Sequence, residues 1–343
     1  MKLGKISDSI LKRTVLKQIK FKRDEIIQGA GIGEDCAFFS CTADEFMVSC
    51  MQEGAVATPA DMARLVIKCA NNLATAGAEP VALLVTYLLP ERASEEKLKQ
   101  LMESASITAK NLGMQIAGGQ TSVSPYVSQK MAVVTGYGKV KKNAYYTTKG
   151  AKPGQDIVIS KWIGLEGTSI LANRKGGELL TRYPAYLIEE AQGFDQYLSI
   201  IPEAATAIKS GVCVMHDASE GGIMAALWEL ADSSGVGLNI ELKKLPIRQE
   251  TVEVCEFYNV NPYELLSGGC LVMTTEDGDG LVQALNREGI SAVVVGKITD
   301  SNDRIILNDE EKRYLDKPKM DEIHRFYPEI IAKNTLKMEA IKS

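Results

Sequence analysis

Apolar runs of strand length alternate with helix-start signals along the whole chain. Thr58 and Ser94 each precede a segment with helical spacing, and both residue types are favoured at helix N-caps. Because strands and helices alternate in both halves, the sequence predicts an α/β or α+β fold, although periodicity leaves the strand order open. The predicted strands are residues 46–50, 81–88, 114–117, 131–140, 156–160, 211–215, 236–242, 269–274 and 292–298.

The length of the chain indicates more than one domain. Its 343 residues suggest two domains, at ~150 residues each. Residues 148–154 combine glycine, lysine and proline, a composition typical of a junction. We therefore expect an N-terminal domain at residues 1–149 and a C-terminal domain at residues 150–343. Residues 164–168 are expected to form a polar loop, and the charged tail after Asn308 is expected to lie on the surface.

Charge and composition exclude several classes of function. Lys and Arg number 39 against 44 Asp and Glu, a net charge of -5 without a basic stripe, so nucleic acid is not an expected partner. The longest apolar stretch, residues 81–89, is shorter than a membrane span of ~20 residues, and the first 23 residues lack the apolar run of a signal peptide. The seven cysteines include no Cys-x-x-Cys pair, which favours a reducing compartment. We therefore expect a cytoplasmic protein without a nucleic-acid or membrane partner.

A glycine-rich loop at residues 29–35 is the first candidate site. Gly31 and Gly33 would let the backbone approach a phosphate closely and aim N–H groups at it. Glu34 and Asp35 could hold Mg²⁺, which prefers oxygen ligands. The spacing matches neither the P-loop nor the dinucleotide-binding fingerprint, and a flexible turn before a strand is the alternative interpretation.

Two further segments place glycines and polar side chains after a predicted strand. Residues 216–222 read His-Asp-Ala-Ser-Glu-Gly-Gly and lead into a helix, whose N-terminus could bind an anion. The alternative is that Asp217 or Ser219 simply caps this helix. Residues 118–121 read Gly-Gly-Gln-Thr, for which an ordinary glycine turn is the alternative.

Taken in order, these segments resemble the PurM-like superfamily, which includes aminoimidazole ribonucleotide (AIR) synthetase. Residues 71–80, Asn-Asn-Leu-Ala-Thr-Ala-Gly-Ala-Glu-Pro, resemble the family's Asn-Asp-Leu-Ala-x-x-Gly-Ala-x-Pro segment. The glycine loop is similar to its Gly-Asp-Asp-Ala-Ala segment, and residues 118–121 to its Gly-Gly-Asp-Thr. Residues 216–222 resemble an element of formylglycinamidine ribonucleotide amidotransferase. The resemblance spans about residues 25–325, and its second half looks most like the HypE-type hydrogenase maturation proteins.

The resemblance implies an architecture and a chemistry. In this family two N-terminal domains pair in a dimer to form a β-barrel, and the C-terminal domain is α/β. Members transfer phosphate from MgATP to an oxygen of a small-molecule substrate, and in such chemistry the protein mainly positions groups and neutralises charge. We therefore expect a homodimer that binds ATP and Mg²⁺, with a small-molecule substrate that the sequence does not identify.

The resemblance also implies roles for individual residues. Asp35 and Asp217 are the catalytic candidates. The metal-ligand candidates are Glu34, Asp35, Glu53 and Asp217. The residues expected to approach or hydrogen-bond ATP are Gly31, Gly33, Asn72, Gly118, Gly119, Gln120 and Thr121.

Three positions depart from the family pattern. Met51, Asn72 and Gln120 stand where the family has metal-binding aspartates. An amide keeps an oxygen acceptor but loses the charge, so the site should hold Mg²⁺ more weakly. If residues 46–53 form one continuous strand, Glu53 projects to the same face as Met51 and could supply a carboxylate.

The functional hypotheses differ in whether catalysis is retained. HypE-type proteins carry a carbamoyl group on a C-terminal cysteine, whereas the last cysteine here is Cys270, so we do not expect that reaction in the family's way. An ATP-dependent enzyme is one hypothesis. A catalytically degenerate nucleotide- or metabolite-binding protein, acting as a sensor or partner subunit, is the second. A relative of thiamine-monophosphate kinase is the third.

Overall fold

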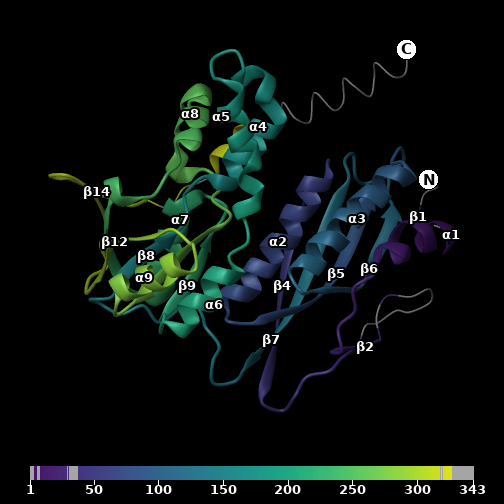
Figure 1. Cartoon of the computed structure of the whole chain (residues 1–343), viewed down its shortest axis with the longest axis horizontal. Coiled ribbons are helices and arrows are strands. Elements are labelled where there is room, and N and C mark those ends of the chain that lie inside the picture. Colours follow the sequence, from purple (N-terminus) through teal and green to yellow (C-terminus); the bar gives the residue numbers. More distant parts are fainter. Residues whose placement is uncertain are drawn as a thin grey trace. The chain divides into compact units, whose positions relative to one another are not determined.

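The chain divides into two compact units, residues 1–146 and residues 147–343. The computed structural model in Figure 1 describes residues 4–5, 8–28, 30, 38–316, 318 and 320–326. Both units combine β-sheets with helices, so the predicted α/β or α+β class is confirmed.

The strands of the first unit form one five-stranded sheet and one separate pair. They are β1 (Gly4–Lys5), β2 (Ile26–Gln28), β3 (Phe38–Phe39), β4 (Glu45–Ala55), β5 (Glu79–Leu89), β6 (Gln115–Val123) and β7 (Met131–Lys141). The sheet order is β1-β6-β5-β7-β4, and β2 pairs with β3. β5 runs parallel to β6 and antiparallel to β7, which pairs antiparallel with β4.

Two long helices cover one face of the five-stranded sheet. α2 (Pro59–Thr75) contacts β4, β5 and β7, and α3 (Glu95–Asn111) contacts α2 and β6; Figure 1 shows the two helices side by side. Thr58 begins α2 with a capping box, and Ser94 caps α3, so both predicted N-caps are confirmed. Before β2 the chain forms α1 (Asp8–Ile10) and the helical turns Leu11–Val15 and Leu16–Gln18.

The opposite face of this sheet carries exposed side chains. From Met47 to Ala55 every second residue of β4 is exposed, and Met51 has an exposed fraction of 62%. The residues between them face α2, where Gly54 lies against Leu65. Because β4 is continuous, Met51 and Glu53 project to the same face, as predicted.

The strands of the second unit form one seven-stranded sheet. They are β8 (Asp156–Ser160), β9 (Val214–Ala218), β10 (Gly237–Glu241), β11 (Cys270–Thr275), β12 (Ala292–Thr299), β13 (Arg304–Asn308) and β14 (Glu311–Tyr314). The order is β14-β13-β10-β12-β8-β11-β9. β10 and β13 are parallel, and the other neighbours are antiparallel.

Some helices of the second unit pack on its sheet, and others pack mainly on one another. They are α4 (Leu165–Leu179), α5 (Ala185–Gln192), α6 (Ile201–Lys209), α7 (Gly222–Ser234), α8 (Gln249–Tyr258) and α9 (Gly278–Arg287). α7 packs on β9, while α6 and α9 contact each other and the central strands. α4, α5 and α8 contact one another and lie together in Figure 1. Short helical turns occur at Gly193–Tyr197, Leu242–Lys244, Pro262–Glu264 and Glu322–Phe326.

Three segments differ from the sequence expectation. Residues 118–121 continue β6 instead of forming a turn, because their pairing with β5 extends to the end of the strand. Residues 164–168 form the start of α4 instead of a loop. The tail is not confined to the surface, since Ile323 and Phe326 are buried in the core formed by α4, α5 and α8. None of the helices in the described part of the chain has the length and apolar character needed to cross a bilayer.

Candidate functional site

The predicted glycine loop connects β2 to β3. The roles predicted for Gly31, Gly33, Glu34 and Asp35 fall on residues outside those that the structure describes. The strands on either side of the loop are anchored to the sheet. Ile26 of β2 and Phe39 of β3 pack against the buried side chains of Val81, Ala82 and Ala117. The Phe39 ring lies 5.0 Å from that of Tyr137 on β7. Side-chain packing therefore holds both strands against the sheet.

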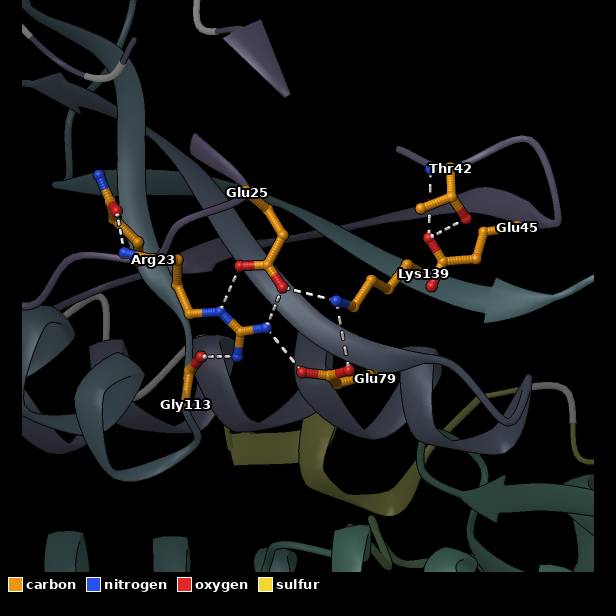
Figure 2. A network of polar contacts seen from close by, with 8 residues as sticks. Arg23, Glu25, Thr42, Glu45, Glu79, Gly113 and Lys139 are labelled. Atoms are coloured by element: carbon orange, nitrogen blue, oxygen red, sulfur yellow. Dashed lines mark hydrogen bonds and ion pairs between the residues drawn. The ribbon is translucent and has the colours of Figure 1, made fainter. Parts of the chain in front are cut away.

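A network of four charged side chains holds the chain just before β2 (Figure 2). Arg23 Nε lies 2.9 Å from Glu25 Oε2, and Arg23 Nη2 lies 2.6 Å from both Glu25 Oε1 and Glu79 Oε1. Lys139 Nζ lies 2.6 Å from Glu25 Oε1 and 3.6 Å from Glu79 Oε2. The Arg23 guanidinium, with help from Lys139, holds the pKa of Glu25 well below its ordinary value of 4.5. The network therefore ties the segment before the glycine loop to β5 and β7.

Gly118 and Gly119, which were also predicted to approach phosphate, follow a bulge in β6 at Ala117. The register with β5 shifts so that Ile116 pairs with Leu83 and Gly118 with Leu84. Gly119 has a φ of 144°, and a Cβ atom there would collide with the carbonyl oxygen of Val85. Glycine is therefore required at this position by the close approach of β5, whatever else binds there. Gly119 and Gln120 are both exposed.

Glu53 and Gln120 face the same side of the sheet but are separated by two strands. Gln120 pairs with Thr86, Thr86 with Val133, and Val133 with Glu53. At ~4.8 Å between neighbouring strands, the two Cα atoms are ~14 Å apart. Side chains in strands stand roughly perpendicular to the sheet, so these two do not converge on one ion within this unit.

Thr121 and Asn72 lie on the helix-covered side of the same sheet. Thr121 alternates with Gln120, pairs with the buried Tyr87 and is only 6% exposed. Asn72 is half-buried on α2, which packs against that face. The structure therefore brings Gly118, Gln120 and Glu53 to one face of the first unit's sheet, whereas Asn72 and Thr121 belong to the other. Gly119 is exposed, but it pairs with the buried Val85.

Asp217 lies on β9, the edge strand of the second unit's sheet. Successive residues of a strand face opposite sides, and His216 faces α7, where its Nε2 lies 3.1 Å from Glu229 Oε2. Asp217 pairs with Leu271 of β11 and projects to the other side. Its side chain is half-buried, so the sheet edge leaves it partly open to solvent.

Asp217 lies near a buried ion pair formed by Lys161 and Glu203. Both partners are buried, and Lys161 Nζ also donates to two backbone carbonyls at 2.6 and 2.7 Å. Burial raises the pKa of the adjacent Cys270 thiol to about 12; Lys161 opposes this rise, and Glu203 and Asp217 add to it. Lys161 is thus engaged with Glu203, and the Asp217 carboxylate belongs to the edge strand of the sheet.

The loop after β9 places two glycines at the start of α7. Gly221 and Gly222 have φ values of 79° and 65°, in the left-handed region that favours glycine. The Gly221 N–H donates to Asp321 Oδ2 at 2.6 Å, and the Gly222 N–H donates to the Ser219 carbonyl at 3.1 Å. These two amides, which the sequence offers to an anion, are therefore engaged with protein groups in this structure.

The sequence analysis missed a second helix start that lies beside this loop. Gly164, with a φ of 71°, precedes α4, and its N–H donates to Ser267 Oγ at 2.8 Å. The Ser267 N–H in turn donates to the Ser219 carbonyl at 3.1 Å, so the starts of α4 and α7 share this contact. The signal in the sequence was the Gly-x-x-Gly spacing of residues 164–167 directly after a strand, followed by the buried Glu166.

The described residues do not by themselves fit a bound Mg²⁺. Within the described part of the chain, no group of three or more His, Cys, Asp or Glu side chains could hold a metal ion. Mg²⁺ prefers oxygen ligands in near-octahedral geometry. Met51 offers a thioether, and Asn72 and Gln120 offer neutral amide oxygens on opposite faces of one sheet.

Each of the two units matches a domain of a known protein family. The N-terminal domain of AIR synthase related proteins matches residues 33–140, and the C-terminal domain matches residues 152–308. A Methanocaldococcus jannaschii protein provisionally named as a hydrogenase expression/formation protein is 26% identical over 94% of this chain and 96% of its own length. Carbamoyl dehydratase HypE from Cupriavidus necator is 29% identical over 63% of this chain and 60% of its own length.

Solved structures show the same fold. The crystal structure of the hydrogenase maturation protein HypE in complex with ATP has a TM-score of 0.77 and 18% identity, covering 92% of this chain and 95% of its own. Thiamine-monophosphate kinase from Stenotrophomonas maltophilia has a TM-score of 0.71 and 19% identity, covering 90% of this chain and 98% of its own. The two family domains, the alternation of elements in each unit and these structures agree. The chain therefore belongs to the AIR synthase-related family and has the two-domain PurM-like fold of the HypE proteins.

Proposed function

We propose that this chain binds ATP as a HypE-like member of its family. The observation that carries the proposal is that both halves of the family fold are retained. The two family domains match residues 33–140 and 152–308, and the fold follows that of HypE in complex with ATP over 92% of the chain.

In this proposal the phosphates of ATP lie against exposed glycine backbone. Gly118 and Gly119 allow close approach, and Gln120 offers an amide N–H from the exposed face that it shares with Gly118. Asp217 supplies a carboxylate from the open edge of β9. The remaining residues of the proposed site are Gly31, Gly33, Glu34, Asp35, Glu53, Asn72 and Thr121.

We infer that ATP binding depends only weakly on Mg²⁺. Met51, Asn72 and Gln120 are neutral where the family has three carboxylates, and the distance between Glu53 and Gln120 keeps them from sharing an ion within one unit. Hydrogen bonds to backbone and amide groups would then contribute most of the affinity, since each such bond to a charged phosphate contributes about 1.5–3 kcal/mol.

Two outcomes of ATP binding are open. Phosphate transfer to a small-molecule substrate oxygen is the family's chemistry, in which the protein positions groups and neutralises charge. A catalytically degenerate nucleotide-binding protein, acting as a sensor or partner subunit, is the second. The replacement of three carboxylates by neutral side chains favours the second outcome, because the developing charge on a transferred phosphate would have fewer neutralising groups.

We also propose that the chain has an N-terminal domain at residues 1–149 and a C-terminal domain at residues 150–343. Two copies would pair through the exposed sheet face of the N-terminal domain. Met47 and Met51 on β4 are 39% and 62% exposed, and large exposed apolar side chains on one sheet face are typical of an interface. Such pairing would form the family's β-barrel. Light scattering of the full chain would test the dimer. We also expect the protein to work in the cytoplasm.

Calorimetric titration of the full chain with ATP tests the proposal directly. We expect micromolar binding, about -8 kcal/mol, that is weakened less than threefold by EDTA. Asp217→Asn should weaken ATP binding at least fivefold because it removes a charged acceptor for the hydrogen-bond donors of the nucleotide. Asp303→Asn makes the same chemical change at an exposed position on the second unit and should leave affinity unchanged.

The two outcomes of binding are separated by following phosphate release in the same samples. Steady release that Asp217→Asn abolishes would support phosphate transfer or hydrolysis. Binding without release would support the degenerate interpretation. If wild-type protein binds no ATP with or without EDTA, the proposed function is wrong.

A further inference from the structure

Asp321 joins three parts of the second unit that are far apart in the sequence. Its Oδ2 accepts a hydrogen bond from the Gly221 N–H at 2.6 Å. Its Oδ1 accepts from the Leu266 N–H at 3.2 Å and from the Ile323 N–H at 2.8 Å. One carboxylate therefore links the loop after β9, the segment before β11 and the C-terminal tail.

The burial of this carboxylate would be costly without these three donors. Asp321 is 1% exposed, and an ionised carboxylate removed from water needs several hydrogen bonds or a cation to offset its desolvation. Burial raises the pKa of the Asp321 carboxyl, and the three backbone donors act against that rise. Simple packing would be served by an apolar side chain, so the carboxylate points to a requirement for these particular contacts.

The loop that Asp321 holds has little freedom to shift. A side chain at Gly222 would meet the backbone of residues 263–265, and one at Gly221 would meet Ala225. Asp321 ties Gly221 on one side and Leu266 on the other, so it fixes the spacing between the loop and the segment that encloses it. Asp217 lies four residues before Gly221, near the end of β9.

The tail is also anchored by residues that follow Asp321. Ile323 and Phe326 are buried among the helices α4, α5 and α8, and Lys175 Nζ lies 5.4 Å from the centre of the Phe326 ring. His324 Nε2 lies 2.7 Å from Glu220 Oε1 at the surface, a second tie to the loop after β9. We name Asp321, Ile323, His324 and Phe326, with these contacts, the tail clasp.

We propose that Asp321 is a positioning residue, and that the tail clasp sets the geometry of residues 216–222 for nucleotide binding. The inference rests on the proposed function in so far as this loop, through Asp217, meets ATP. Neither Asp321 nor His324 would touch the nucleotide. They act by holding Gly221 and Glu220, and through them the backbone that carries Asp217.

The test compares three variants of the full chain. Asp321→Asn keeps the size of the side chain but replaces one acceptor oxygen with an NH₂ group, so at least one of the three backbone donors loses its partner. His324→Gln removes the imidazole of the surface tie and leaves Asp321 in place. Glu322→Gln is the matched control, since it makes the same carboxylate-to-amide change one residue away, where Glu322 pairs with Arg325.

Two readouts separate a positioning role from a structural one. Hydrogen exchange of peptides covering residues 216–222 reports the loop, and peptides from β8 and β12 report the core of the same unit. ATP titration reports the site. We expect Asp321→Asn to speed exchange in the loop about tenfold, with little change in β8 and β12, and to weaken ATP binding at least fivefold. His324→Gln should shift both readouts in the same direction by about two- to threefold, and Glu322→Gln should shift neither.

Each outcome decides the inference. Unchanged exchange in the loop of Asp321→Asn would overturn it, whatever ATP does. Faster exchange with wild-type ATP affinity would assign Asp321 a structural role only and also overturn it. If Asp321→Asn does not fold, His324→Gln decides the question by the same two readouts. If the wild-type protein binds no ATP, the proposed function is wrong, and the positioning role for nucleotide binding is rejected with it. Hydrogen exchange in the loop would still report whether the tail clasp holds residues 216–222.

Discussion

Glu53 and Gln120 lie in one cross-strand row on the exposed face of the first unit's sheet, with Val133 and Thr86 between them. The Glu53 carboxylate is therefore three strand positions away from the amide of Gln120, the position on β6 where the sequence resemblance implies an aspartate. A rescue of the metal site by Glu53 would need a different partner from Gln120. Because Glu53 is too far away to replace a carboxylate at residue 120, the effect of a charge at this position can be tested by substituting Gln120 alone.

Restoring the carboxylate at residue 120 should increase the role of Mg²⁺. We expect Gln120→Asp to raise the ATP affinity measured with Mg²⁺ at least threefold relative to the affinity measured in EDTA, because a carboxylate binds Mg²⁺ better than an amide does. Gln120→Asn, which shortens the side chain without adding charge, is the control. Equal effects of EDTA on the two variants would contradict the prediction.

Gly119 should tolerate no side chain. Its φ of 144° disfavours L-residues, and a Cβ would collide with the backbone of Val85, so Gly119→Ala should lower the free energy of unfolding by about 3 kcal/mol or more. Gly150 also has a positive φ, 121°, but a Cβ there meets nothing within 4 Å. Gly150→Ala should therefore cost only ~1–2 kcal/mol, the strain of the backbone alone. Denaturant titration of both variants measures the difference.

Local chemistry explains which parts of the fold the sequence predicts. Thr58 and Ser94 satisfy N–H groups within their own helices, so the starts of α2 and α3 could be predicted from a few neighbouring residues. Gly77, with a φ of 72°, follows the end of α2 for an equally local reason. Contacts of this kind need no knowledge of the rest of the chain.

The errors arose where distant segments decide the local structure. Gly119 lies in a strand because Val85 of β5 pairs with it, which no local pattern reveals. Asp321 contacts Gly221 across 100 residues of sequence, so its role could not be predicted from the charged tail in which it occurs. Sequence patterns located part of the candidate site, but non-local hydrogen bonds determine what the residues around it can do.

The ion network before β2 should make the first unit sensitive to acid. The pKa of Glu25 is lowered in the folded protein, so its contribution to stability is fully present above the unfolded value of about 4.5 and is lost as the pH falls toward the lower folded value. Glu25→Gln should lower the free energy of unfolding by about 1–3 kcal/mol at pH 7. The difference between variant and wild type should shrink as the pH falls below 4.5.

A second carboxylate in the same view provides the control for that experiment. Glu45 accepts hydrogen bonds from Thr42 (Figure 2), at 3.3 Å from the backbone N–H and 3.0 Å from the hydroxyl. Glu45→Gln should change the stability of the protein by less than about 1 kcal/mol. Thermal or denaturant unfolding between pH 3 and pH 7 measures both variants. Equal losses of stability in Glu25→Gln and Glu45→Gln at every pH would contradict the prediction.

Cys50 and Cys69 form a pair of thiols that should be convertible to a disulfide. Their Sγ atoms lie 3.4 Å apart between β4 and α2, with Cys50 partly exposed and Cys69 buried. A small-molecule disulfide would first exchange with the Cys50 thiolate, releasing one thiol and leaving a mixed disulfide. The Cys69 thiolate would then attack the Cys50 sulfur and release the second thiol, so that two protein thiols are oxidised and one added disulfide is reduced.

The second exchange step should control the rate, because it needs the thiolate of Cys69. Its hydrogen bond with Cys50 and its burial both raise the pKa of Cys69, so cross-linking by oxidised glutathione should be slow at pH 7 and faster at pH 9. Intact mass under non-reducing conditions measures the product, and the cross-link should also raise the thermal unfolding midpoint by closing a 19-residue loop. Cys50→Ser should abolish both effects. A lasting mixed disulfide on Cys50, without a cross-link at pH 9, would show that β4 and α2 cannot bring the two sulfurs into bonding distance.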